Sequence, residues 1–250
     1  MVSIDLNCDL GESFGGYRLG EDAAMMALIS SANVACGSHA GDPNVMAATV
    51  KLAKQYSVAL GAHPGYPDLQ GFGRRDMALS GDEIVHSILY QLGALSGFAR
   101  SAGIPLTHVK PHGALYNRAA RDPIAAVAIA QAVKLFDPDL ILIGLAGSAL
   151  VDAGTAAGLT TVNEGFPDRV YLPDGSLMPR SQHGAVITDP DDVADNALKL
   201  AREGIQISGE AIKIDTLCLH GDNPEAVENA RTVREALEKA GIDIRSLSNQ

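Results

Sequence analysis

Short apolar runs alternate along the chain with longer segments whose apolar residues recur at helical spacing. After Ser80, the apolar residues Ile84, Ile88 and Leu92 fall on one face of a helix. Ser80 and the glutamate three residues later form a capping box, and Gly103 provides a stop signal. The pattern therefore predicts one long helix between residues 80 and 103.

Seven apolar runs lie between the helical segments and lack strict polar alternation, as expected for parallel strands covered on both faces. They are residues 4–6, 33–35, 58–60, 106–109, 140–145, 160–162 and 214–219. The repeated order of strand and then helix predicts an α/β fold with a parallel sheet. Strand count alone leaves two arrangements open, a doubly wound sheet and a closed barrel.

Helix starts recur in one chemical form, an Asp or Asn followed by proline. The Asp or Asn side chain accepts from free helix amides, and proline suits the first helical position. These starts are Asp42-Pro43, Asp122-Pro123, Asp189-Pro190 and Asn223-Pro224. They support the alternating order, and they also give Asp42 a sufficient structural role.

The composition indicates one globular unit. A chain of 250 residues with 46% hydrophobic content can bury a large core, so we expect one domain over residues 1–250. The net charge of -11, from 19 basic and 30 acidic residues, argues against a nucleic-acid partner.

No export or membrane signal is recognisable. The opening MVSIDLNCDLGE lacks a basic region followed by an apolar one, and no run approaches the roughly 20 apolar residues that span a bilayer. Cys8, Cys36 and Cys218 are too few and too scattered for a disulfide framework, and we expect them to be buried thiols. These features predict a cytoplasmic protein.

Polar residues gather where the predicted strands end. In parallel α/β folds the loops at that end converge on one crevice that carries the active site. The stretch VKPHGALYN at residues 109–117 forms one such end, and the long loops at 65–80 and 165–182 are expected to be functional. We expect a catalytic group at this end: Asp9, Glu12, His63, Lys110 and His112. We expect substrate contacts from Asn7, His39, Asp42, Arg74, Tyr116, Asn117, Glu164, Asp168, Arg169, His220 and Asp222.

Two chemistries suit these residues. Neutral imidazoles beside a carboxylate could ligate a divalent metal that activates water, although no HxxxH or HExxH spacing supports it. Alternatively, a carboxylate or histidine could act as general base while a cation stabilises developing negative charge. The spacing leaves both open and assigns no metal ligand. The chain has no GxxxxGK[ST] loop and no GxGxxG after a strand, so it shows no nucleotide-binding motif.

Six segments together resemble the LamB/YcsF family, in the expected order and across nearly the whole chain. They are DLNCDLGE, NVACGSHAGDP, LGAHPGYPD, GFGRR, VKPHGALYN and CLHGDNP. One departure is the segment EGFPDR at residues 164–169, where the family usually has EVFADR. Its Glu, Asp and Arg are retained.

The resemblance implies a distorted seven-stranded parallel β/α barrel, TIM-like and similar to glycoside hydrolases and deacetylases. It also implies a hydrolase that cleaves 5-oxo-L-proline to L-glutamate, with ATP as co-substrate, alongside 5-oxoprolinase subunits B and C. Two rivals are a metal-dependent deacetylase-like hydrolase and a subunit that only binds the lactam. We further expect Asp9 and Lys110 to face solvent in the barrel mouth, where replacing either would change stability little.

Overall fold

The computed structural model describes residues 2–180, 182–219, 221 and 226–247. Parallel strands form a closed barrel in the order β1-β2-β3-β4-β5-β6-β9, and β9 pairs with β1 to complete the ring. The strands are β1 (Ser3–Leu10), β2 (Ser31–Ala35), β3 (Ala59–His63), β4 (His108–Val109), β5 (Ile141–Leu145), β6 (Thr161–Gly165) and β9 (Thr216–Leu219). The prediction of a seven-stranded β/α barrel is confirmed, and the ring settles the choice between open and closed.

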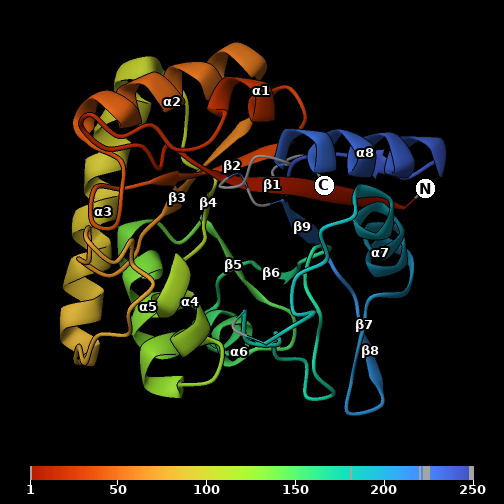
Figure 1. Cartoon of the computed structure of the whole chain (residues 1–250). Helices are drawn as coiled ribbons and strands as arrows, with labels where there is room; N and C mark the ends of the chain where they lie inside the picture. The colour runs from red at the N-terminus through yellow and green to blue at the C-terminus, as the bar shows by residue number, and fades with distance from the viewer. Residues whose placement is uncertain (1, 181, 220, 222–225, 248–250) are drawn as a thin grey trace.

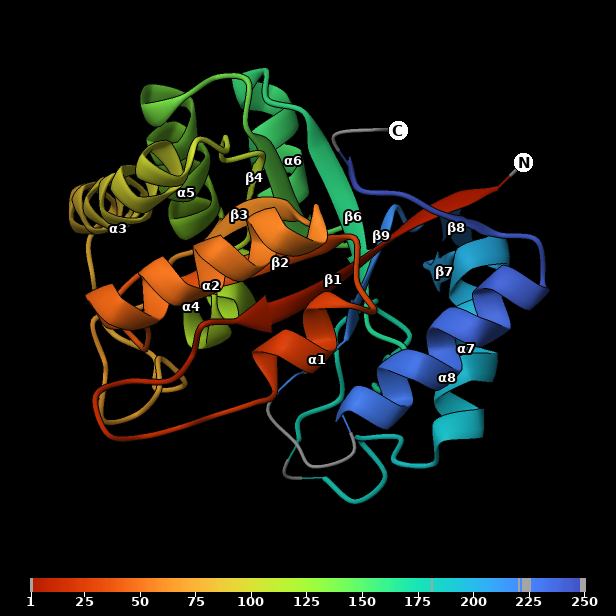
Figure 2. The same cartoon turned by 90° about the horizontal axis from the view of Figure 1, so that it is seen from above.

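Helices surround the barrel, with α3 and α5 together on one flank and α7 and α8 together on another (Figures 1 and 2). They are α1 (Asp22–Met26), α2 (Pro43–Tyr56), α3 (Gly81–Ala102), α4 (Gly113–Ala119), α5 (Pro123–Phe136), α6 (Ala149–Ala157), α7 (Pro190–Glu203) and α8 (Ala226–Lys239). Within the described residues, none of these helices combines the length and apolar character needed to cross a membrane.

The predicted helix ends are confirmed wherever the structure describes them. Asp42, Asp122 and Asp189 each accept from backbone amides at the start of α2, α5 and α7. The capping box at Ser80 opens α3, and Gly103 ends it in a left-handed conformation with φ 71°. The fourth predicted start, at residues 223 and 224, lies outside the described residues.

Two strand features were not predicted. β10 (Asp243–Ile244) pairs in parallel with the start of β1, outside the ring. β7 (Ile205–Ile207) and β8 (Glu210–Ile212) form an antiparallel hairpin that projects away from the barrel (Figure 1). Its turn places Ser208 at φ 51° and Gly209 at φ 89°, as a two-residue hairpin turn requires. Ser-Gly is a weaker sequence signal for that turn than Asn-Gly, so the hairpin was missed.

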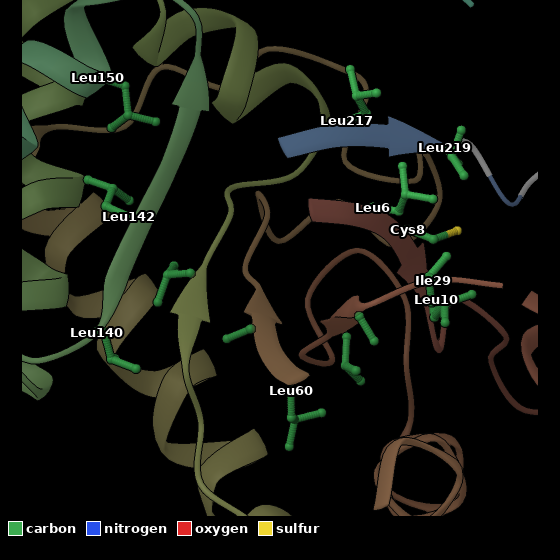
Figure 3. Packing of buried hydrophobic residues seen from close by; sticks show 14 of the residues in the cluster. Leu6, Cys8, Leu10, Ile29, Leu60, Leu140, Leu142, Leu150, Leu217 and Leu219 are labelled. Atoms are coloured by element: carbon green, nitrogen blue, oxygen red, sulfur yellow. The ribbon is translucent and has the colours of Figure 1, made fainter. Parts of the chain in front are cut away.

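β1 has two different faces, contrary to the expectation that the strands lack polar alternation. Leu6, Cys8 and Leu10 belong to the main hydrophobic cluster, and Figure 3 shows them among leucines of other strands. The intervening Asn7 instead bonds to polar side chains of other barrel strands. Successive residues of a strand point to opposite faces, so β1 contributes a polar lining to the barrel interior. That lining leads to the carboxyl end of the barrel.

The close packing of β3 against β4 gives the first prediction. A Cβ added at Gly61 would lie 2.0 Å from Nε2 of His108, whose ring is fully buried. Gly61→Ala must displace that ring, and it is expected to lower the free energy of unfolding by about 2–3 kcal/mol in urea titrations. Gly93→Ala in α3 is the matched control, because no atom lies within 4 Å of the added Cβ. It should stabilise by roughly 0.5–1 kcal/mol. Equal stability of the two variants would contradict the close contact between Gly61 and the ring of His108.

Candidate active site

A cavity of about 670 Å³ opens at the carboxyl ends of the barrel strands. Its wall includes Asp9 of β1, His63 at the end of β3, and Lys110 just after β4. Residues 174–180, from the long loop after β6, also line it. The cavity therefore lies where parallel β/α barrels carry their active sites.

The ammonium group of Lys110 is enclosed by acceptors, and only 3% of the side chain is exposed. Its Nζ lies 2.9 Å from Asp9 Oδ1 and 2.8 Å from Glu164 Oε1. It also donates to Asn7 Oδ1 at 3.0 Å and lies 3.1 Å from Cys218 Sγ. An ammonium has three N–H donors, so these four neighbours occupy all of them.

The expectation that Lys110 faces solvent in the barrel mouth is wrong. Burial alone would lower the pKa of Lys110, but the carboxylates of Asp9 and Glu164 hold that pKa well above its ordinary value. The side chain therefore stays charged inside the protein. It fixes two carboxylates in place, and it presents no spare N–H to a substrate in this arrangement.

Asp9 is the carboxylate of this group with an edge toward the cavity, since 18% of its side chain is exposed. Oδ1 accepts from Lys110 and from Asn33 Nδ2 at 2.9 Å, and Oδ2 lies 3.3 Å from His63 Nε2. Burial would raise the pKa of Asp9, but His63 and Lys110 together hold it well below its ordinary value. Asp9 is therefore an ionised, oriented acceptor at the cavity wall. It lies within β1 rather than after it.

A hydrogen-bonded layer inside the barrel supports Lys110. Asn7 Nδ2 donates to Glu164 Oε1 at 3.0 Å and to Thr216 Oγ1 at 2.7 Å, and the Tyr116 hydroxyl donates to Glu164 Oε2 at 2.6 Å. Asn7 and Glu164 are fully buried. Both were expected to contact substrate, but these bonds engage them in positioning Lys110 instead.

His63 and His112 meet at the cavity wall. His63 Nδ1 is 2.7 Å from the backbone oxygen of Lys110, and His112 Nε2 is 2.7 Å from the backbone oxygen of Phe72. A carbonyl oxygen only accepts, so each of these two nitrogens carries a proton. The other two nitrogens, His63 Nε2 and His112 Nδ1, lie 3.0 Å apart. Burial, with His39 and His63 adding to it, lowers the pKa of His112 to about 3.

Glu12 and His39 lie next to His63 and His112. The His39 ring stacks on His112 with centroids 3.7 Å apart and planes within 2°. Glu12 Oε1 lies 3.3 Å from His39 Nε2 and 3.4 Å from His112 Nδ1. Burial lowers the pKa of His39 well below its ordinary value, so this ring is neutral.

These four residues could hold a metal ion. Glu12, His39, His63 and His112 each offer a ligand atom, and the four atoms lie within 4.8 Å of one another. Imidazole and carboxylate together suit zinc and related divalent ions. The four residues come from separate segments, which explains why no short sequence spacing revealed the cluster.

The cavity reverses the charge balance of the chain. Its lining contains five basic side chains, Arg74, Lys110, Arg121, Arg169 and Arg180, against two acidic ones, Asp9 and Asp174. The whole chain has 19 basic and 30 acidic residues. A cationic lining in an acidic protein favours an anionic ligand.

The expected site residues separate into three groups. The cavity lining includes Asp9, His63, Arg74, Lys110, His112, Tyr116, Asn117 and Arg169. Other described residues that were expected at the site are not part of that lining: Asn7, Glu12, His39, Asp42, Glu164 and Asp168. Asp42 instead caps α2 and accepts from the Gly15 amide. His220 and Asp222 lie outside the described residues.

Sequence reasoning missed several residues of the site. Arg121 and Arg180 add charge to the cavity lining. Arg180 lies in the long loop at 165–182, which was already expected to be functional, whereas Arg121 follows a helix and gave no signal. Inside the barrel, His108 Nε2 is 2.9 Å from Asn33 Oδ1 and so holds the amide that bonds Asp9.

The expected thiol character of the cysteines is confirmed. Cys8, Cys36 and Cys218 are all free and buried. Burial raises the pKa of the Cys218 thiol well above its ordinary value, so the sulfur beside Lys110 keeps its proton. It therefore adds no charge to the site.

Comparison with known proteins gives one consistent result. Residues 4–250 match the LamB/YcsF family. A Syntrophobacter fumaroxidans protein named as the A component of 5-oxoprolinase is 54% identical over 253 residues, which cover 100% of both chains. The Bacillus subtilis protein of the same name is 51% identical over 254 residues, covering 100% of this chain and 99% of that protein.

A solved structure agrees with this result. The lactam utilization protein from Thermus thermophilus superimposes with a TM-score of 0.92 at 51% identity. The match covers 98% of this chain and 100% of that protein. With a family match and relatives that extend over almost all of its length, the chain belongs to the LamB/YcsF family.

Proposed function

We propose that this chain is the lactam-hydrolysing component of an ATP-dependent 5-oxoprolinase. It would convert 5-oxo-L-proline to L-glutamate while ATP is hydrolysed to ADP and phosphate, together with 5-oxoprolinase subunits B and C. Relatives of matching length that are named as the A component of 5-oxoprolinase support the proposal, as does the similar lactam utilization protein.

The observation that carries the proposal is the cationic cavity that contains an ionised carboxylate. 5-Oxoproline is a small molecule with a carboxylate, and a phosphorylated form of it carries more negative charge. Arg74, Arg121 and Arg180 line the cavity and would attract either one. Asp9, with an exposed edge at the wall, would accept a hydrogen bond from the attacking water and orient it.

The need for ATP follows from the chemistry of the lactam. A five-membered lactam is a resonance-stabilised amide with little drive to open. Phosphorylation of its oxygen makes the ring carbon more electrophilic, so that water can add to it and the C–N bond can break to give an open-chain acyl phosphate. A second water then releases phosphate and L-glutamate. The chain has no Walker-type phosphate loop, which favours phosphorylation by the partner subunits and hydrolysis in this cavity.

Two other functions predict different results. A metal-dependent deacetylase-like hydrolase would act on an amide or a carbohydrate without ATP. A protein that only binds the lactam would hold it but would not accelerate hydrolysis of a pre-activated lactam. Single-turnover hydrolysis of such an activated lactam by this chain alone would exclude the binding-only function.

Reconstitution provides the second prediction. The purified chain with ATP and 5-oxoproline should form no glutamate, because it shows no phosphate-binding motif. Addition of subunits B and C should yield glutamate and ADP in equal amounts, measured by coupled assays. Stoichiometric glutamate and ADP from the single chain would refute the division of labour. No glutamate from the complete mixture would refute the proposed function itself.

A further inference from the structure

Four potential ligand atoms lie close together beside the cavity: His63 Nε2, His112 Nδ1, Glu12 Oε1 and Asp9 Oδ2. With one proton on each ring, that proton is donated to a backbone carbonyl, and His63 Nε2 and His112 Nδ1 then present lone pairs. These nitrogens are 3.0 Å apart. Glu12 Oε1 lies 3.4 Å from His112 Nδ1, and Asp9 Oδ2 lies 3.3 Å from His63 Nε2. Lone pairs at these distances repel unless a cation lies between them.

The spacing of these atoms matches a coordination shell. Two ligand atoms about 2.1 Å from one ion, at angles of roughly 90–110°, are about 3.0–3.4 Å apart. The contacts of His112 Nδ1 with His63 Nε2 and Glu12 Oε1, at 3.0 and 3.4 Å, fall at the two ends of that range. The hydrogen bonds from the far side of each ring fix its orientation, as the outer partners of metal-binding histidines commonly do.

His39 has a different role from the other two histidines. Its ring is parallel to that of His112, at 3.7 Å, so an ion in the plane of the His112 ring lies outside the plane of the His39 ring. His39 Nε2 is 3.3 Å from Glu12 Oε1, and Nδ1 has no hydrogen-bond partner among the described residues. A neutral ring with its proton on Nε2 accounts for both facts, because it donates to Glu12 and leaves Nδ1 bare. His39 is therefore a positioning residue that holds Glu12 and braces His112.

The alternative occupant of this gap is a proton shared by the two rings. A shared proton would require an imidazolium within a buried group that includes three histidines. A divalent ion instead gains bonds from two imidazoles and a carboxylate at once.

We propose that Glu12, His63 and His112 form a binding site for a divalent transition-metal ion of the zinc class. Two imidazoles and one carboxylate are a ligand set found in catalytic zinc sites, which keep a fourth position open. Asp9 would lie beside that open position, at the cavity wall. Magnesium and calcium prefer oxygen ligands and fit this set poorly. This proposal concerns metal binding only. It can be tested without the lactam reaction, and failure of the proposed function would not overturn it.

Calorimetric titration of the chelator-treated, full-length chain tests the proposal. Zn²⁺ should bind with one equivalent per chain and should raise the temperature of thermal unfolding, whereas Mg²⁺ at the same concentrations should do neither. His112→Ala and Glu12→Gln should each weaken zinc binding by more than the roughly 10–100-fold that loss of an outer partner costs. His39→Phe keeps the stacked ring and loses only the bond to Glu12, so its loss should stay within that range. His86→Ala, at an exposed position of α3, is the control and should bind as the parent does.

The outcomes separate the possibilities. Absence of zinc binding by the parent chain would overturn the site and leave the shared proton as the occupant. Unchanged binding by both His112→Ala and Glu12→Gln would also overturn it, because the ion would then lie elsewhere. Should a variant unfold, X-ray absorption of the zinc-loaded parent decides, and a first shell without imidazole nitrogen would overturn the assignment. One equivalent that is lost in both ligand variants and retained in His86→Ala would establish the site.

Discussion

Replacement of Lys110 by methionine is expected to destabilise the protein and to remove most lactam cleavage from the reconstituted enzyme. The ammonium lies 2.9 Å from Asp9 Oδ1 and 2.8 Å from Glu164 Oε1, with almost no exposure. Methionine fills a similar volume but leaves the Glu164 carboxylate buried without its counter-charge. Removing one partner of a buried ion pair costs about 3–5 kcal/mol.

The loss of activity has a separate cause. Lys110 anchors Asp9, and a misplacement of a reacting group by about 1 Å can lower turnover about a hundredfold. Urea titration measures the stability change, and glutamate release by the complete enzyme measures turnover. Lys51→Met, at an exposed position of α2, is the control and should change neither. Parent-like stability of Lys110→Met would contradict the burial and charge pairing of this side chain.

A double variant distinguishes charge from packing. In Lys110→Met, adding Glu164→Gln removes the uncompensated buried charge, while the amide oxygen can still accept from Asn7 or Tyr116. The double variant should therefore recover part of the lost stability and none of the activity. If it is less stable than Lys110→Met alone, the cost arises from packing and not from the unpaired charge.

The sequence predicted the barrel because its signals are local. Each barrel strand overlaps one of the predicted apolar runs, and Asp42, Asp122 and Asp189 cap the helices they were expected to cap. Such signals need only a few neighbouring residues, and the surrounding fold does not change them. Polar and apolar residues also alternate in β1, in the order IDLNCDL from Ile4 to Leu10. This alternation was missed because every strand was taken to be a continuous buried run.

The environment of each side chain could not be predicted in this way. Because the carboxyl ends of parallel strands carry the active site, the sequence correctly predicted that Lys110 lies near the cavity. Its burial, however, depends on Asn7, Glu164 and Cys218, which come from three other strands. From its position at a strand end alone, a lysine is expected to face solvent. Only the acceptors around it show that this one is buried. The same applies to His112, whose free nitrogen is identified only through the carbonyl of Phe72 in a distant loop.

Asp9→Asn is expected to lower lactam cleavage in the reconstituted enzyme by about 100- to 10,000-fold, the range for loss of a group that handles the reacting proton. Asparagine keeps the shape of the side chain, and its amide oxygen can still accept from Asn33. It removes the negative charge that orients water at the cavity wall.

The same variant should be much more stable than Lys110→Met. After Asp9→Asn, the ammonium of Lys110 keeps Glu164 as its counter-charge at 2.8 Å, so no buried charge is left alone. The replaced carboxylate is also partly exposed, at 18% of its side chain. We expect a loss of about 2 kcal/mol or less in the free energy of unfolding, the scale of one hydrogen bond to a charged group. Asp152→Asn, an exposed position of α6, serves as the control for both measurements. Turnover near that of the control would remove Asp9 from the chemistry, whereas a stability loss as large as that of Lys110→Met would show that Asp9 acts mainly as the counter-charge of Lys110.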